Sequence, residues 1–217
     1  MELLQSLLDV RAIILWGGIV GITAVVFVET GLFFGFFLPG DSLLVTAGIL
    51  AATPADILAA TPLLDSAAPI LDIRWLIPCA CAAAIIGDQT GYVIGRRAGR
   101  ALVQRYEKFR VHLERAHAFY EEYGSKTIVL ARFVPIVRTF VPAVAGAARM
   151  NYGRFVTYNI LGGVLWVLST TLLGYVLGKN IPDIGRYLHL VIAVVVVLSI
   201  LPSLVEWRKH KKINARQ

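Results

Sequence analysis

The chain has 217 residues, a mean hydropathy of +0.70 and only 16% charged residues. These values exclude an ordinary soluble domain and favour a single compact membrane domain. The net charge of +7 would suit a nucleic-acid-binding protein, but the basic residues cluster beside apolar segments and no nucleic-acid-binding motif is present. We therefore expect the basic residues to orient the chain in a membrane, and we expect no nucleic-acid partner.

Long apolar runs predict the membrane-spanning helices. A helix that crosses a bilayer about 30 Å thick needs about 20 apolar residues. The runs that meet or approach this length are 12–28, 75–95, 155–178 and 187–205. The sequence predicts an all-α integral membrane protein with about four transmembrane helices.

The first run is followed by apolar segments that are too short to span a membrane. Residues 30–40 and 42–52 are separated by Asp41, beside Pro39 and Gly40. A helix of about 11 residues is only about 15 Å long, half the thickness of the hydrocarbon core. We predict a re-entrant helical hairpin here, so that 12–52 forms the first spanning helix and its hairpin.

A second region behaves in the same way. Residues 127–148 are apolar but contain Pro135 and Pro142, and prolines break helices. We predict a second re-entrant hairpin over this range. Irregular backbone at membrane depth is tolerated only inside protein or beside a wet cavity. The two halves would then form an inverted repeat, a plan that recurs in transporters.

The distribution of lysine and arginine predicts the orientation. Segment 96–126 and the tail 206–217 are rich in basic residues, whereas the loop 53–74 has only Arg74. The positive-inside rule places the first two in the cytoplasm and the loop outside, so both termini are predicted to be cytoplasmic. Segment 96–126 reads as an amphipathic helix on the membrane surface, with a solvated connector as the alternative.

Four ionisable residues fall inside apolar regions. They are Glu29, Asp41, Arg132 and Arg138. Each charge at membrane depth costs roughly 2.5–3.5 kcal/mol on insertion scales, so such residues usually line a polar site or pathway. The pattern predicts a transport site that pairs carboxylates with guanidinium groups. The alternative is that these residues form only structural ion pairs.

Three motifs resemble those of a known family. Glu29 followed by L-P-G-D at 38–41, G-D-Q-T-G-Y-V-I-G-R-R-A-G at 87–99, and A-R-F-V-P-I-V-R-T-F-V-P-A-V-A-G at 131–146 look like the signatures of the DedA family. That family shares its core, the VTT or SNARE-associated domain, with eukaryotic lipid scramblases. The resemblance implies a bacterial inner-membrane transporter that depends on the proton gradient, with links to undecaprenyl phosphate recycling and phospholipid movement.

The resemblance also implies roles for the charged residues. Glu29 and Asp41 match the essential acids, and Arg132 and Arg138 match the essential arginines. Arginine presents a planar fork of donors that suits phosphate oxygens, so the arginines are expected to bind a lipid phosphate. The acids are expected to couple transport to protons, with Glu29 the first choice. Asp41 could instead cap a helix that starts at Ser42.

Other residues are expected to support this site. They are Pro39, Gly40, Asp88, Pro135, Pro142 and Gly146. Asp88 could pair with Arg96 or Arg97, or cap a broken helix. The cysteines Cys79 and Cys81 are read as small apolar residues. We expect no cofactor and no metal site, because the four histidines are scattered.

The sequence thus predicts a proton-coupled transporter or flippase of lipid phosphates, with undecaprenyl phosphate as the favoured substrate. The expected partners are membrane lipids, either a polyprenyl phosphate or a phospholipid, and protons, with a homo-oligomer left open. The alternatives are a phospholipid flippase or scramblase, and a proton-coupled exporter of small cations. An embedded phosphatase would need a histidine or another nucleophile near the arginines, so we expect the protein not to be an enzyme.

Overall fold

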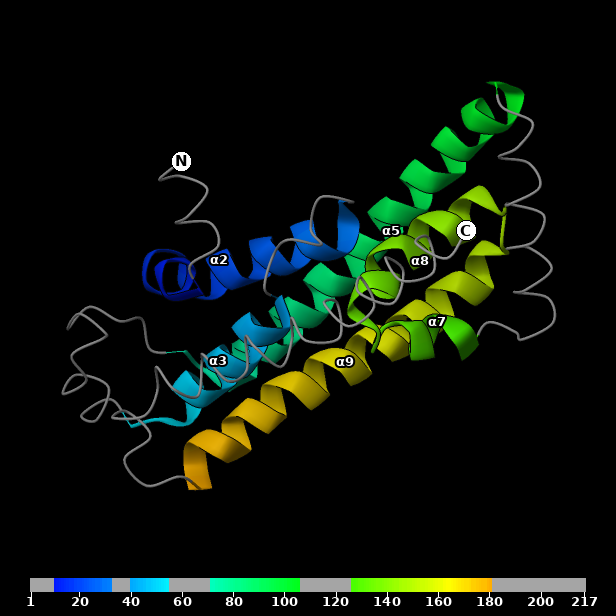
Figure 1. Ribbon diagram of the computed structural model, residues 1–217. Coiled ribbons are helices and arrows are strands. Elements are labelled where there is room, and N and C mark those ends of the chain that lie inside the picture. Colours follow the sequence, from blue (N-terminus) through cyan, green and yellow to red (C-terminus); the bar gives the residue numbers. More distant parts are fainter. Residues whose placement is uncertain (1–9, 33–39, 55–70, 106–125, 181–217) are drawn as a thin grey trace, which may run out of the picture. The chain divides into compact units, whose positions relative to one another are not determined.

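The computed structural model describes residues 10–32, 40–54, 71–105 and 126–180 (Figure 1). All regular structure in these ranges is helical, as the sequence predicts. The helices, in chain order, are α2 (Val10–Gly31), α3 (Gly40–Ala52), α5 (Ile73–Arg105), α7 (Lys126–Ala131), α8 (Pro135–Ala147) and α9 (Tyr152–Asn180).

Two of the described helices are long and apolar enough to cross a membrane. They are the part Ile73–Gly99 of α5 and the whole of α9, Tyr152–Asn180. At 1.5 Å per residue, each exceeds the roughly 30 Å of a hydrocarbon core. They contain the predicted spans 75–95 and 155–178. The predicted span 187–205 and the basic tail 206–217 lie outside the described residues.

The first predicted span, 12–28, is not one straight helix. Gly18 has φ 50° and ψ −138°, so α2 is kinked there, and its apolar part Gly17–Gly31 is shorter than the two helices that could cross a membrane. Glycine adopts this backbone conformation without the penalty that a side chain would bring. In the first predicted hairpin, residues 33–39 lie outside the described ranges. The second arm, α3, begins at Gly40.

Helix α5 continues past the boundary that the sequence suggested. Its helical backbone runs to Arg105, whereas the surface segment was predicted to start at residue 96. Arginine, alanine and leucine are good helix formers, so the charged residues after position 95 extend the helix and do not end it. Most of segment 96–126 lies outside the described residues.

The region predicted as the second hairpin consists of two short helices that contact each other, α7 and α8. The break falls between them, where Val134 is extended with φ −105° and ψ 108°. The residue before a proline avoids the helical region, and Pro135 then starts α8 as its first residue. The prediction that Pro142 also breaks the helix is wrong, because α8 continues through it to Ala147.

The chain divides into two compact units. One unit includes α3 and the end of α9 from Thr170 onward. In this unit α3 and α9 touch through glycines: a methyl group on Gly48 would lie 2.2 Å from the carbonyl oxygen of Thr171. A methyl group on Gly174 would lie 2.0 Å from the carbonyl oxygen of Val45. Small residues of this kind let membrane helices approach closely.

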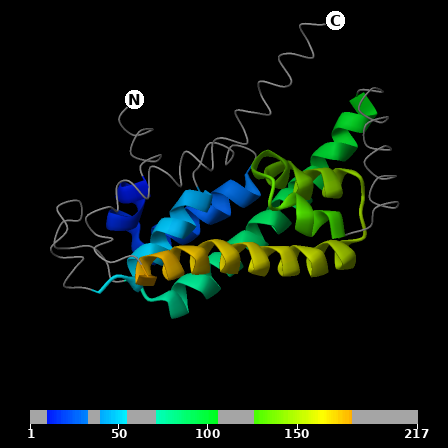
Figure 2. The ribbon, with the colours of Figure 1, turned by 60° about the horizontal axis from the view of Figure 1, so that its bottom comes forward.

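The other unit contains residues 23–32, most of α5, both short helices and the first half of α9. Here the backbones of α8 and α5 are in direct contact. A methyl group added to Gly95 would lie only 2.1 Å from the carbonyl oxygen of Ala143. A methyl group on Gly146 would likewise be 2.0 Å from the carbonyl oxygen of Tyr92. Figure 2 shows α7 and α8 beside α5 and the first half of α9.

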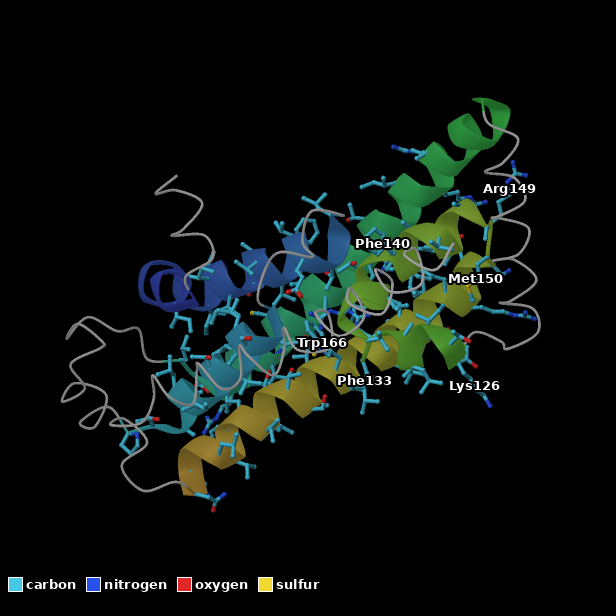
Figure 3. All side chains as sticks on the ribbon, in the orientation of Figure 1. Lys126, Phe133, Phe140, Arg149, Met150 and Trp166 are labelled. Atoms are coloured by element: carbon cyan, nitrogen blue, oxygen red, sulfur yellow. The ribbon has the colours of Figure 1, made fainter. Side chains whose placement is uncertain are left out.

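A small aromatic core holds one end of this unit. The Tyr92 ring stacks on Phe155 with centroids 4.5 Å apart, and its hydroxyl donates to the carbonyl oxygen of Met150 at 2.6 Å. Met150 follows Arg149, whose φ of 57° turns the chain from α8 into α9. Figure 3 shows Arg149 and Met150 at this turn, with Trp166 farther along α9. The core therefore fixes where α8 ends and α9 begins.

Candidate functional site

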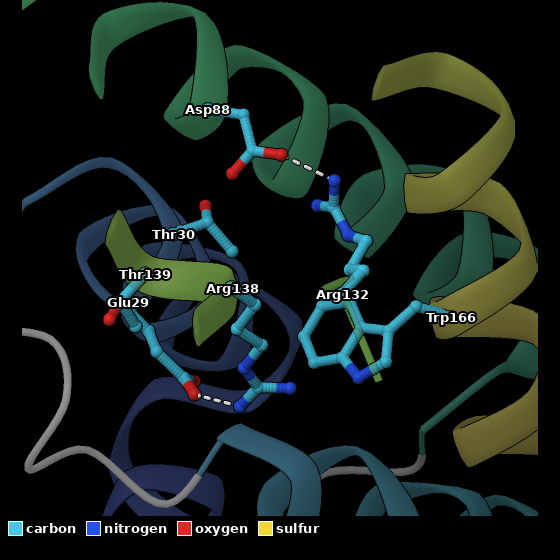
Figure 4. Close-up of a pocket in the computed structure, with 7 residues that line it drawn as sticks. All are labelled: Glu29, Thr30, Asp88, Arg132, Arg138, Thr139 and Trp166. Atoms are coloured by element: carbon cyan, nitrogen blue, oxygen red, sulfur yellow. Dashed lines mark hydrogen bonds and ion pairs between the residues drawn. The ribbon is translucent and has the colours of Figure 1, made fainter. Parts of the chain in front are cut away.

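A buried pocket gathers most of the charged side chains that the sequence singled out. It is lined by Glu29, Thr30, Asp88, Arg132, Arg138, Thr139 and Trp166, all from the unit that contains α8 (Figure 4). The lining side chains come from the end of α2, the middle of α5, the α7–α8 break, the start of α8 and the middle of α9. Segments far apart in the sequence therefore build one site.

The break between α7 and α8 brings the two arginines together. Arg132 lies in the break, and Arg138 lies in the first half of α8. Both line the pocket. The convergence follows from Pro135, because a continuous helix would separate these positions along its axis.

Arg132 is held by several acceptors. Its guanidinium donates to the Asp88 carboxylate, to Asn159 Oδ1 at 2.9 Å and to the carbonyl oxygen of Ala84 at 3.4 Å. Asn159 in turn donates from Nδ2 to the carbonyl oxygen of Ile85 at 3.1 Å. The Arg132 and Asp88 side chains are only 5% and 6% exposed. The network fixes the position of this cation against α5 and α9.

Arg138 forms the second buried pair. Its guanidinium donates to the Glu29 carboxylate, and the two side chains are 8% and 3% exposed. Glu29 stands near the C-terminal end of α2, beside Thr30, whose hydroxyl donates to the carbonyl oxygen of Val26 at 2.9 Å. The end of α2 is thereby placed so that the Glu29 carboxylate contacts Arg138 on α8.

The pocket combines two carboxylates with two guanidinium groups. Removing one partner from a buried ion pair leaves an uncompensated charge and is far more damaging than replacing the whole pair. A guanidinium that binds a carboxylate through its donor edge can bind a phosphate through the same edge. The arrangement can therefore hold either its own acids or a competing anion.

Trp166 lies against both arginines, and sequence reasoning missed it. The guanidinium carbon of Arg138 is 4.7 Å from the ring centroid, and that of Arg132 is 5.6 Å away. The residue is only 2% exposed. Tryptophan in spanning helices gathers at the membrane interfaces, so its position in the middle of the apolar span 155–178 was a signal. Asn159, an amide in the same span, was another.

Asp88 has a different partner from those expected. It pairs with Arg132 and not with Arg96 or Arg97. On a helix only residues three or four apart face each other, so neither arginine is a neighbour of Asp88 on α5. Arg96 is exposed and donates to the Tyr92 hydroxyl at 3.2 Å. Asp88 thus belongs to the site itself.

The remaining predicted residues have other positions. Asp41 lies in the first turn of α3, in the other unit, and this helix starts two residues before the expected Ser42. Gly146 packs on the backbone of α5, and Pro142 packs on Gly91 of the same helix, where an added methyl group would lie 3.4 Å from the proline Cβ. Pro39 lies outside the described residues.

The cavity itself is small. Its free volume is about 10 Å³, which is about the space that one water molecule needs. A phosphate group does not fit without a rearrangement of the lining side chains. Among the residues that the structure describes, no three histidine, cysteine or acidic side chains are placed to hold a metal ion.

Comparisons with known proteins agree on one family. The family model described as the VTT domain matches residues 6–176. The protein named DedA from Escherichia coli K12 is 43% identical over 195 residues, which cover 88% of this chain and 83% of that protein. The inner membrane protein YqjA from the same organism is 34% identical over 198 residues, covering 85% and 82%.

A mycobacterial relative is also similar. The uncharacterized membrane protein Rv0364 from Mycobacterium tuberculosis H37Rv is 46% identical over 188 residues, covering 85% of this chain and 76% of that protein. No solved structure matches the chain significantly.

Proposed function

Because the chain belongs to the DedA family of VTT-domain membrane proteins, we propose that it is a proton-coupled transporter of lipid phosphates in the bacterial inner membrane. Undecaprenyl phosphate is the favoured substrate. The family membership confirms the resemblance carried by the three motifs. The transport function is supported mainly by one observation, the buried pocket in which Glu29 and Asp88 neutralise Arg138 and Arg132.

The proposed cycle begins with an exchange of anions on Arg138. A phosphate oxygen would replace the Glu29 carboxylate on the guanidinium edge, because both anions use the same donors. Once released, the buried Glu29 carboxylate would be an isolated charge in an apolar surrounding, which favours uptake of a proton. Phosphate binding and proton binding would thus be linked at one pair of residues.

Arg132 would have a different role in this scheme, that of a fixed neighbour of Arg138. Its bonds to Asp88, Asn159 and the Ala84 carbonyl hold it in place while Arg138 changes partner. With Arg132 still paired with Asp88, protonation of Glu29 would leave one net positive charge on Arg138, which favours an anionic headgroup over a cation. This favours a lipid phosphate over the alternative substrate, a small cation.

The size of the cavity fits a closed state of a transporter. A space for about one water cannot hold the headgroup. The lining side chains must therefore separate before the substrate binds, as an alternating-access cycle requires. A phosphatase is less favoured, since both lining carboxylates are engaged by the arginines and the seven lining residues include no histidine or cysteine.

Transport in reconstituted vesicles tests the proposal. The wild-type chain should move labelled undecaprenyl phosphate faster under an imposed pH gradient, and it should move labelled phosphatidylglycerol less. The variant Glu29→Gln should insert and fold, because a neutral amide is cheaper to bury than a carboxylate. It should still bind the lipid phosphate but lose the response to the gradient.

A control and two outcomes complete the experiment. Asp72→Asn changes an acid to its amide at an exposed position and should transport like the wild type. A wild-type gradient response in Glu29→Gln would remove Glu29 from proton coupling. Transport of phosphatidylglycerol equal to that of undecaprenyl phosphate would replace the favoured substrate by the wider class of phospholipids.

A further inference from the structure

Trp166 takes part in the site in a way that the ion pairs do not explain. It is almost fully buried, it lines the pocket, and both guanidinium groups lie within 6 Å of its ring centroid. We propose that Trp166 is a positioning residue: its ring face holds Arg132 and Arg138 in place while a guanidinium edge exchanges a carboxylate for a phosphate. This inference rests on the proposed function and adds a residue to its site.

The proposal depends on the shape of the guanidinium group. Its donors point outward in one plane and bind oxygens at the edge, whereas its flat face can lie on an aromatic ring. Glu29 uses the edge of Arg138, and Trp166 lies 4.7 Å away at the centroid. An anion can therefore leave the edge without disturbing the contact with the ring.

The ring also offsets the loss of one carboxylate from the pocket. When Arg138 loses Glu29, its charge would stand uncompensated beside the Arg132–Asp88 pair in a space shielded from water. The face of an indole ring carries negative electrostatic potential and attracts both cations. Tryptophan is the best side chain for this contact, and burial strengthens it. The ring would keep the arginines together through the step in which they lack one carboxylate.

A packing role alone makes a different prediction. Trp166 fills space between helices, so any smaller residue will lower the stability of the fold. Phe155 offers a matched comparison, because it is another fully buried aromatic residue on α9, and it packs in the Tyr92 core away from the pocket. Phe155→Leu should lower stability without a specific effect on phosphate binding.

The test measures binding of farnesyl monophosphate to the purified full-length chain in detergent, with farnesol as the uncharged control of equal chain length. Inorganic phosphate in a second arm separates a free phosphate from a lipid headgroup. Trp166→Leu removes the ring, Trp166→Phe keeps a weaker one, and Phe155→Leu controls for lost aromatic packing. Thermal unfolding is followed for each variant.

We expect Trp166→Leu to bind farnesyl monophosphate about ten-fold more weakly than the wild type, and Trp166→Phe about three-fold more weakly. Farnesol binding should change equally little in Trp166→Leu and Phe155→Leu. Equal phosphate affinity in Trp166→Leu and the wild type, or a parallel loss for phosphate and alcohol, would overturn this inference alone. A wild-type chain that binds no phosphate probe would overturn the proposed function and the inference together.

Discussion

The pair of Asp88 and Arg132 allows a quantitative test of the site. Both side chains are at most 6% exposed, and Arg132 also donates to Asn159 and to a backbone carbonyl. Breaking a buried pair by removing one partner costs about 3–5 kcal/mol, whereas replacing both by apolar residues is often nearly neutral. We expect Asp88→Leu and Arg132→Met each to lower the free energy of unfolding by about 3 kcal/mol or more.

The double variant should recover much of that loss. Without either charge, the main remaining loss of stability comes from Asn159, whose Oδ1 atom no longer accepts a hydrogen bond from Arg132. A buried acceptor left unsatisfied costs about 1–3 kcal/mol. For a chain of this size, about 3 kcal/mol corresponds to roughly 6–12 °C in melting temperature. The expected order of stability is the wild type, then the double variant, then the two single variants.

Reversible unfolding in detergent, followed by circular dichroism, measures these differences. Asp72→Leu makes the same substitution at an exposed position, where Asp72 accepts the backbone N–H of Arg74 at 2.8 Å at the start of α5. Loss of such a cap costs about 1 kcal/mol. If the double variant were destabilised by the sum of the two single effects, the two residues would not be energetically coupled, and the reasoning would be refuted.

Three further predictions follow from the helix contacts, the arginine chemistry and the charge distribution. Gly95→Ala should destabilise the chain by about 1–3 kcal/mol in the same unfolding assay, because its methyl group would meet a backbone carbonyl oxygen at 2.1 Å. Gly17→Ala is the control and should be tolerated, because a methyl group there would have nothing within 4 Å. Arg138→Lys should lose most vesicle transport despite its charge, since lysine lacks the planar fork; full transport would show that charge alone suffices. Cysteines near Ala60 should be labelled from outside and those near Arg115 only from the cytoplasm; external labelling near Arg115 would reverse the orientation.

The sequence predicted the site best at residues whose charge is energetically unfavourable in an apolar segment. Glu29, Arg132 and Arg138 stand out because charges are rare in apolar segments, and the structure places all three in one pocket. The break before Pro135 was also predictable, since proline acts on its immediate neighbours. These signals are local, so a single sequence contains them.

Interactions between distant segments were not predictable in the same way. The pairing of Asp88 with Arg132 depends on how α5 and the α7–α8 break pack, which no local pattern encodes. Trp166 was missed for a different reason: its place far from the membrane interfaces was a signal, but an aromatic residue in an apolar span ordinarily indicates packing. Pro142 shows the opposite error: the helix accommodates it beside Gly91, so tertiary packing overrides a strong local preference.

The glycine contacts between α5 and α8 restrict how the site can move. At Gly95 and Gly146 the backbones of the two helices meet with no side chain between them. A slide of α8 by one turn, about 5.4 Å, would bring a bulkier residue such as Pro142 against the Tyr92 carbonyl. The two helices therefore form a rigid pair that holds Asp88 and Arg138 at a fixed separation along the helix axes. Opening the pocket must then come from rotation of side chains and from movement of the elements around this pair.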